Sequence, residues 1–452
     1  MATWTRKSWL TAAVAGLTVA AGCTRTAAEE ARPAAARDDG MKDQVMRRAE
    51  GMIREGRRTF RFDTFGDEAF WTDTLKLNAA VEKVSPRTAL AVGLKVDVDA
   101  LPRTVVDAIQ AGQVNLDDPA VTAALLRLDA VVGLKGSVDA QNRVTRLGIS
   151  CALCHSSVDD SLTSGIGHRL DGWPNRDLNV GAIVNLSPDL SAVASLLGVP
   201  EAAVRGVITQ WGPGKFDAAV FLDGKAVGPD GKPHPTLIPA AFGLSGVNLH
   251  TYTGWGSVPY WNAFVANLEM HGQGTFFDPR LDDAARFPVA AANGFGHLTA
   301  PPGQDRVTSK LSALHFYQLA LEAPRAPEGS FDAAAAGRGA IAFAGQAKCA
   351  GCHVPPLFTE PGWNQHAAAE IGIDDFQASR SPDGRYRTTP LKGLWARMRA
   401  GNATDPSGNG HGFYHDGRFP TLLDVVNHYD GFMGLGLSPA QKSDLVEYLK
   451  SL

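Results

Sequence analysis

Four of the five cysteines in this 452-residue chain fall in one short pattern that occurs twice. The pattern C-x-x-C-H is formed by Cys151, Cys154 and His155, and again by Cys349, Cys352 and His353. At this chain's frequencies of 5 Cys and 12 His, one match has a chance expectation of roughly 0.0015, so two matches are not accidental.

Two thiols three positions apart can bond to the two vinyl groups of one haem, and the adjoining His then lies beneath the iron as its proximal ligand. The pattern therefore predicts two covalently bound c-type haems, haem 1 on His155 and haem 2 on His353. A redox-active dithiol and a four-thiolate zinc site stay open as alternatives. A dithiol needs no following His, however, and a zinc site is not expected in two such distant halves.

The fifth cysteine, Cys23, follows an export signal. Arg6 and Lys7 precede an apolar run from Leu10 to Ala21. That run is too short for a bilayer core, which needs about 20 residues, so residues 1–22 are interpreted as a signal peptide. The ending Ala20-Ala21-Gly22-Cys23 resembles a bacterial lipobox, which predicts a lipidated Cys23 and a periplasmic, lipid-anchored protein. An ordinary signal cleaved nearby, with Cys23 discarded or free, is the alternative.

The composition excludes several classes of protein. With 44% hydrophobic and 20% charged residues, the chain is neither disordered nor collagen-like, and five cysteines cannot form a disulfide-dense scaffold. The net charge of -4 predicts no affinity for nucleic acid. Residues 23–45 are expected to form a flexible tether, so the membrane is reached only through the lipid anchor.

The remaining sequence predicts a mainly α fold with long loops and few short strands. We expect an N-terminal haem domain over 46–325 and a C-terminal cytochrome-c-like domain over 326–452, divided near a proline-rich hinge at 323–327. Helices are expected over 101–109, 119–132 and 333–343, and a short strand over 218–222.

Two capped helices are expected near the C-terminus. Ser438 and Gln441 form a capping box with Pro439 at the first helical position. The preceding helix begins at Thr421, and its helical period places Tyr429 on the interior face and His428 away from it.

The second half resembles the bacterial di-haem cytochrome c peroxidases and their MauG-like relatives, most strongly over 311–452. The resemblance rests on the approach from Phe331 and Asp332 to Cys349, on Arg387 to Leu391, on Phe413 to Phe419, and on the 421–429 helix. Between the two motifs the match is limited to Gly167-His168 and Pro174-Asn175, and before the first motif nothing matches. The family implies one haem in each of two mostly helical domains, with a reactive N-terminal haem and a C-terminal haem that relays electrons.

The resemblance also implies site residues. Tyr429 matches the sixth ligand of haem 2, which is Met in the peroxidases and Tyr in MauG; Met433 and Met398 are rival ligands, and a core tyrosine is the structural alternative. His168 matches a distal His on a mobile loop, with an exposed loop histidine as the alternative. The family's Trp-Asp-Gly-Arg stretch is missing, and its nearest analogue starts at Trp211, so Trp211 is taken as the catalytic relay candidate, beside Trp255 and Trp261. A calcium ion would be held by Asn175, Thr388 and Pro390.

These observations predict a peroxidase that reduces hydrogen peroxide at haem 1. Its electrons would come through haem 2 from a small electron-donor cytochrome or cupredoxin. Two other functions stay open. One is pure electron transfer by two six-coordinate haems. The other is oxidation of an organic or protein substrate, as in MauG-like enzymes or rubber-cleaving haem oxygenases, which the aromatic-rich segment 156–310 favours.

Overall fold

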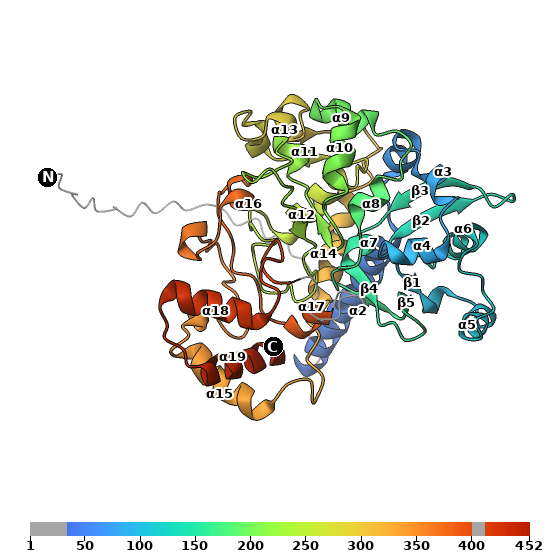
Figure 1. Ribbon diagram of the computed structural model, residues 1–452. Helices are drawn as coiled ribbons and strands as arrows, with labels where there is room; N and C mark the ends of the chain where they lie inside the picture. The colour runs from blue at the N-terminus through green and yellow to red at the C-terminus, as the bar shows by residue number, and fades with distance from the viewer. Residues whose placement is uncertain (1–33, 400–411) are drawn as a thin grey trace, which may run out of the picture. The chain divides into compact units, whose positions relative to one another are not determined.

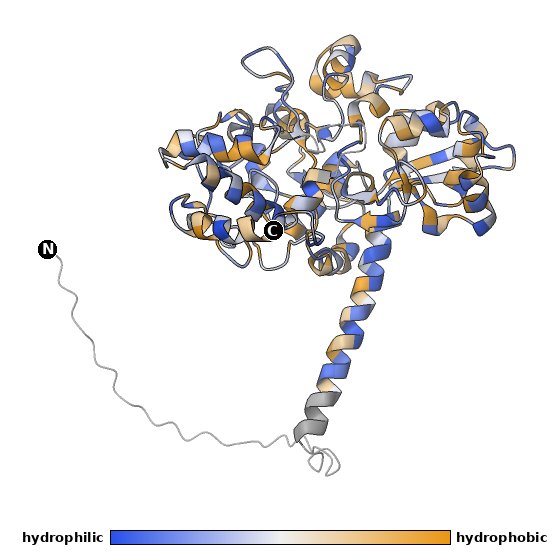
Figure 2. Cartoon of the chain, turned by 60° about the horizontal axis from the view of Figure 1, so that its bottom comes forward, coloured by the Kyte–Doolittle hydropathy of each residue, from blue (hydrophilic) through white to orange (hydrophobic). Residues whose placement is uncertain are grey.

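The computed structural model describes residues 34–399 and 412–452, so the expected signal peptide and Cys23 lie outside the described residues. The chain divides into two compact units, Met1–Glu50 and Gly51–Leu452, and helix α2 (Ala34–Phe62) runs across this division. Residues 34–45 are therefore helical and do not form the flexible tether expected there. Their Ala, Arg, Met and Lys residues are good helix formers, and Figure 2 shows polar residues along most of α2.

Helices dominate the described part of the chain (Figure 1), as the mainly α prediction requires. The longer helices after α2 are α14 (Leu311–Ala320), α15 (Ala333–Ala344), α18 (Leu422–Met433) and α19 (Pro439–Ser451). The shorter helices are α3 (Leu77–Val81), α4 (Pro86–Ala91), α5 (Arg103–Gln110), α6 (Pro119–Arg127), α7 (Ala152–His155), α8 (Val180–Val184), α9 (Ser191–Leu197), α10 (Glu201–Ile208), α11 (Val220–Asp223), α12 (Val258–Phe264), α13 (Pro288–Ala292), α16 (Phe376–Ser379) and α17 (Leu394–Arg399). Two π-helical turns are η1 (Ala69–Thr74) and η3 (Val265–Glu269), and the 3₁₀ turns are η2 (Val98–Ala100), η4 (Pro279–Asp282), η5 (Thr308–Lys310), η6 (Cys349–Gly351) and η7 (Ala368–Glu370).

The strands are short and occur in separate pairs. Four pairs are antiparallel: β2 (Leu134–Val138) with β3 (Val144–Ile149), β4 (Ser156–Val158) with β6 (Arg169–Asp171), β7 (Lys215–Phe216) with β8 (Thr236–Leu237), and β9 (Phe276–Phe277) with β10 (His297–Leu298). The pair of β1 (Val96–Asp97) with β5 (Ile166–Gly167) is parallel. The prediction of a strand over 218–222 is wrong. Residues 220–223 form α11, which ends at the left-handed Gly224 (φ 71°), and a five-residue apolar run is too short to distinguish helix from strand.

The expected helix ends are confirmed where capping residues mark them. Asp332 accepts hydrogen bonds from the N–H groups of Ala334 and Ala335 at the start of α15. Thr421 and Asp424 form a capping box on α18, as Ser438 and Gln441 do on α19. The helix observed in place of the one expected over 119–132 is shorter than predicted and ends at Arg127. The chain turns at Asp129, which has a positive φ of 53°.

The buried apolar residues form clusters that do not cross the expected boundary at residue 326. One cluster includes Cys349 and is built from residues between Ala342 and Leu452, whereas the cluster that includes Cys151 is built from residues between Ile53 and Leu321. The two C-x-x-C-H motifs therefore pack in separate cores. The predicted division into two domains agrees with this packing and stays a prediction, since both parts lie within the unit Gly51–Leu452.

Helices α15 and α19 pack closely in the C-terminal core (Figure 1). A Cβ atom placed on Gly339 of α15 would lie 2.1 Å from the carbonyl oxygen of Asp444 on α19, so only glycine permits this approach. Phe343, one turn after Gly339, then packs edge-on against Tyr448 with ring centroids 5.2 Å apart. This packing supports the 3₁₀ turn that carries the second motif.

In the described ranges, no single helix is long and apolar enough to cross a membrane. Helices α9 and α10, taken together as a bent pair, are long and apolar enough to cross a membrane by length and composition only.

Candidate functional site

The first motif lies on the wall of a large cavity. Cys151 precedes the short helix α7, and Cys151, Cys154 and His155 all line this main cavity of about 390 Å³. The Nδ1 of His155 donates to the carbonyl oxygen of Pro239 at 3.1 Å, which leaves a lone pair on Nε2. Burial lowers the pKa of His155 to about 4, so the imidazole is neutral, as a metal ligand must be.

The second motif repeats this arrangement in the other core. Cys349 starts the turn η6, and the Nδ1 of His353 donates to the carbonyl oxygen of Phe358 at 3.1 Å. Burial again lowers the pKa of the histidine to about 4. Each histidine is thus oriented by a backbone carbonyl, which is the usual partner of a metal-ligating imidazole.

The state of the cysteines argues against a redox-active dithiol and against a four-thiolate zinc site. All four sulfurs are free, and burial raises the pKa of Cys151 and Cys154 to about 12 and that of Cys349 to about 11. A reactive dithiol needs a thiolate, which these environments disfavour. Within the described ranges, the four sulfurs do not come together as one group of metal ligands.

Three buried arginines also line the main cavity and fit the predicted haem. The Nε atoms of Arg176, Arg387 and Arg397 have no hydrogen-bond partner, and neither has Nη1 of Arg176. Burial lowers the pKa of Arg387 to about 9 and that of Arg397 to about 10. Although Nη1 of Arg387 donates to the carbonyl oxygen of Leu249, buried guanidinium nitrogens left unsatisfied are costly, so the cavity calls for an anionic occupant. The predicted haem 1, an apolar macrocycle with two propionate carboxylates, would supply such anions in the cavity that His155 and the two cysteines also line.

The C-terminal part of the chain closes this cavity. Arg380, whose side chain is fully buried, also lines it and donates to Asp223 at 2.8 Å and to Asp217 at 3.0 Å. These ion pairs join the segment after α16 to the segment around α11. The main cavity is therefore walled by residues from both sides of position 326.

Glu269 is a cavity residue that the sequence interpretation missed. It ends the π-helical turn η3, lines the main cavity and lies close enough to Cys154 to raise the pKa of that thiol. Burial alone raises the pKa of Glu269 to about 7. The signal in the sequence was a single acidic residue in the otherwise uncharged stretch from Val258 to Met270.

His250 was missed for a different reason. Its Nε2 donates to the carbonyl oxygen of Val247 at 3.0 Å, while its buried Nδ1 has no partner and the residue lines the main cavity. Burial, with the nearby Arg387 cation, lowers the pKa of His250 to about 3. Nothing around His250 in the sequence distinguishes it from a loop histidine.

The structure does not bring the two predicted catalytic residues into the main cavity. His168 has a half-exposed side chain whose Nδ1 lies 2.9 Å from Asp99, and it is not part of the cavity wall. Trp211 lines a smaller, second cavity, whereas Trp255 and Trp261 line the main one. The positions of His168 and Trp211 therefore do not support the roles that the family resemblance implies.

Tyr429 lies near the second motif, and its side chain contacts that of Tyr414. Burial raises the pKa of Tyr429, and the nearby thiols of Cys352 and Cys349 raise it further. His428 is half-buried like Tyr429, stacks on Phe432 and donates from Nε2 to the carbonyl oxygen of Ile371 at 3.0 Å, so burial does not separate the two residues as expected. Of the rivals, Met433 is 43% exposed and Met398 packs in the same core as Cys349. The sixth ligand of haem 2 stays a prediction.

The predicted calcium ligands bond to separate partners. The Nδ2 of Asn175 donates to the carbonyl oxygens of Gly93 and Leu153, and its buried Oδ1 has no partner. The hydroxyl of Thr388 donates to Glu360, and Pro390 is buried. These contacts do not form a calcium cage, and the calcium ion stays a prediction.

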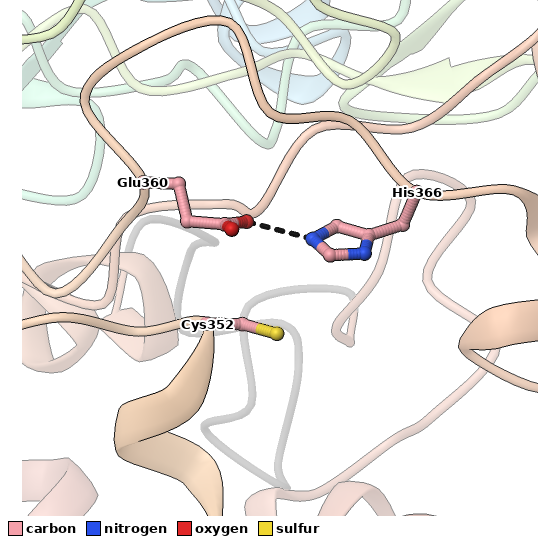
Figure 3. A group of neighbouring side chains, drawn as sticks. All are labelled: Cys352, Glu360 and His366. Atoms are coloured by element: carbon pink, nitrogen blue, oxygen red, sulfur yellow. Dashed lines mark hydrogen bonds and ion pairs between the residues drawn. The ribbon is translucent and has the colours of Figure 1, made fainter.

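Cys352, Glu360 and His366 form a cluster with metal-ligating side chains (Figure 3), and their ligand atoms lie within 4.8 Å of one another. The Nε2 of His366 lies 2.7 Å from Glu360, and its Nδ1 lies 3.1 Å from Glu370. Both ring nitrogens of His366 therefore have a carboxylate partner within hydrogen-bonding distance. If Cys352 binds haem 2, this cluster forms a polar edge beside it.

No protein-family model and no curated protein matches this sequence. Among solved structures, the chain is similar to Kuenenia stuttgartiensis hydrazine synthase pressurised with xenon, at 19% sequence identity and a TM-score of 0.27. The match covers 50% of this chain and 75% of the other. A likeness of this degree is partial, so the resemblance to the di-haem peroxidases stays a prediction and the function rests on this chain's own residues.

Proposed function

We propose that this chain is an exported di-haem c-type cytochrome that reduces hydrogen peroxide at haem 1. Cys151, Cys154 and His155 would hold haem 1, and Cys349, Cys352 and His353 would hold haem 2. When bound, the haems supply the redox chemistry. The observation that carries the proposal is the main cavity, which combines a histidine oriented by a backbone carbonyl, buried arginines with unsatisfied nitrogens and the carboxyl of Glu269.

Glu269 has the properties of the acid–base group that peroxide reduction needs. Reduction of one peroxide to two waters consumes two electrons and two protons, and a proton must move from one peroxide oxygen to the leaving oxygen. A carboxyl with a pKa of about 7 exists in both forms near neutral pH, so it can accept the first proton and return it. Its apolar surroundings on η3 limit competing contacts with water.

The electrons would come from a small donor cytochrome or cupredoxin through haem 2. We further propose periplasmic localisation with a lipid anchor on Cys23. Both proposals rest on the export signal and on the separate packing of the two motifs.

The test is peroxide-dependent oxidation of a reduced donor by the holo-protein, with spectra recorded in both oxidation states. Glu269→Gln keeps the shape of the side chain and removes the titrating group, so the rate should fall by about 10²–10⁴-fold with both haems retained. Glu322→Gln, an exposed glutamate outside the cavity wall, is the matched control. Two haems that are six-coordinate and inert to peroxide and carbon monoxide would contradict the proposal and favour pure electron transfer.

A second candidate function is oxidation of an organic substrate. It is favoured by the apolar lining of the main cavity, which extends from His155 to residues such as Val105, Ile109 and Leu125. Product analysis after incubation with peroxide and apolar compounds distinguishes it from simple peroxide reduction.

A further inference from the structure

A second cavity of about 130 Å³ adjoins the main cavity, and we refer to it as the side chamber. It lies between α8, α9 and α10 and the aromatic side chains of Phe70, Trp71 and Phe221. Trp71 and Glu269 line both cavities, so the two spaces share a wall. The side chamber reaches the surface near Val199, which is 40% exposed, and the exposed Ala203.

The walls of the side chamber are apolar apart from three groups. Trp211 is 4% exposed, and its indole Nε1–H is a buried donor without a partner. The imidazole of His271 stacks on Phe70 with ring centroids 3.6 Å apart, and burial lowers its pKa to about 4. The third group is the carboxyl of Glu269 on the shared wall.

These features define the chemistry of an occupant. An apolar cavity of about 150 Å³ stays dry and binds benzene, so a space of this size fits one aromatic ring. A buried donor left unsatisfied is unfavourable, which favours an occupant with a hydrogen-bond acceptor. An uncharged His271 and an apolar wall disfavour an ionic ligand.

We propose that the side chamber binds a small monocyclic phenol, whose hydroxyl oxygen accepts a hydrogen bond from Trp211. The proposal rests on the proposed peroxidase function, because it makes the phenol a second electron donor beside the donor protein. Two phenols each lose one electron and one proton and become phenoxyl radicals. One peroxide takes up the two electrons and two protons and becomes two waters. Glu269, on the shared wall, is placed to accept the phenol protons.

Binding is measured first, on the oxidised holo-protein without peroxide, by calorimetric titration with phenol and with toluene. Toluene has the same ring without the acceptor. Phenol should bind about tenfold more tightly than toluene, as expected for one satisfied buried donor. Trp211→Phe keeps an aromatic side chain and removes the N–H, so phenol should lose its advantage over toluene.

A pair of adjacent variants tests the location. Ala203→Phe fills the mouth of the side chamber and should abolish binding of both compounds. Ala202→Phe adds the same ring one position away on α10, at an exposed residue outside the chamber wall, and should leave binding unchanged. The proposal is overturned if phenol does not bind, if phenol and toluene bind equally, or if Ala203→Phe binds phenol like the wild type.

The peroxidase function and phenol binding in the side chamber can be contradicted independently of each other. Phenol binding without peroxide turnover by any donor would overturn the peroxidase function and keep the binding site. Peroxide turnover with a reduced donor protein but no phenol binding would overturn the side chamber proposal alone.

Discussion

The indole rings of Trp173 and Trp395 lie 5.9 Å apart and perpendicular, in edge-to-face contact. Trp173 follows Gly172, whose N–H donates to the carbonyl oxygen of His155. Trp395 follows Leu394, which packs in the core that holds Cys349. This aromatic contact therefore joins the surroundings of the two motifs.

Replacing Trp395 is expected to slow electron transfer between the haems. Trp395→Leu removes the ring that contacts Trp173, and we expect haem 2 oxidation after mixing reduced protein with peroxide to slow by at least about tenfold, a barrier increase of about 1.4 kcal/mol. Stopped-flow absorbance measures this rate. Trp363→Leu, which changes a 78% exposed tryptophan in the same part of the chain, should leave the rate unchanged. Equal rates in the two variants would contradict a role for the Trp173–Trp395 contact.

Removing one cysteine pair should remove one haem. Cys349→Ala with Cys352→Ala should halve the covalent haem content, because Cys151 and Cys154 pack in a separate core. The alkaline pyridine spectrum measures haem content. A thiol titration of the unfolded wild-type holo-protein should detect none of these four cysteines, and four reactive thiols per chain would contradict covalent attachment.

Tyr429 should affect the spectrum of haem 2. Its position beside Cys349 and Cys352 predicts that Tyr429→Phe shifts the absorption and EPR signals of one haem, whereas Met433→Leu, at a 43% exposed position, leaves both spectra unchanged. The opposite pattern would assign the ligand to Met433. If the spectra change in neither variant, Tyr429 is a core tyrosine and Met398 is the remaining candidate ligand.

The sequence predicted correctly those features that depend on residues close together in the chain. The capping boxes at Thr421 and Ser438 each depend on residues a few positions apart. The wall of the main cavity depends instead on residues that are far apart in the sequence. Arg176, Glu269 and Arg397 come together only in the tertiary structure, and none of them belongs to a recognisable motif.

The role of His168 stays a prediction, because its place in the sequence does not determine where its side chain points. Its place after Gly167 matched a family pattern, but the backbone at β5 and β6 turns its side chain to Asp99 instead of the cavity. The resemblance was patchy in this region, so sequence position alone did not specify the direction of the side chain.

The pKa of Glu269 predicts the pH dependence of peroxide reduction. As a base, its carboxylate form is required, so kcat/KM for peroxide should rise with pH and level off above about 7. Glu269→Gln should lose this rise together with most of the rate. A wild-type profile that is flat between pH 5 and 8 would contradict the role of Glu269.

The same pKa predicts an effect on stability with a definite sign. The folded protein holds the Glu269 proton more tightly than the unfolded chain, whose carboxyl has an ordinary pKa near 4.5. This contribution to stability is fully present below about pH 4.5 and is lost as the pH rises through about 7. The melting temperature of the wild type should therefore fall relative to Glu269→Gln over this range, and a constant difference would contradict the raised pKa.

The buried arginines predict a change in the potential of haem 1. Arg397 is a buried cation whose Nε has no partner among the described residues, and it lines the same cavity as His155. A nearby positive charge stabilises the reduced haem, which carries one positive charge less than the oxidised haem. Arg397→Met should therefore lower the midpoint potential of haem 1 by roughly 60 mV, the equivalent of ~1.4 kcal/mol for one electron. Arg325→Met, which replaces an exposed arginine outside the cavity wall, should leave the potential unchanged in the same spectroelectrochemical titration. A rise in potential, or the same potential in both variants, would show that Arg397 does not pair with the haem 1 propionates.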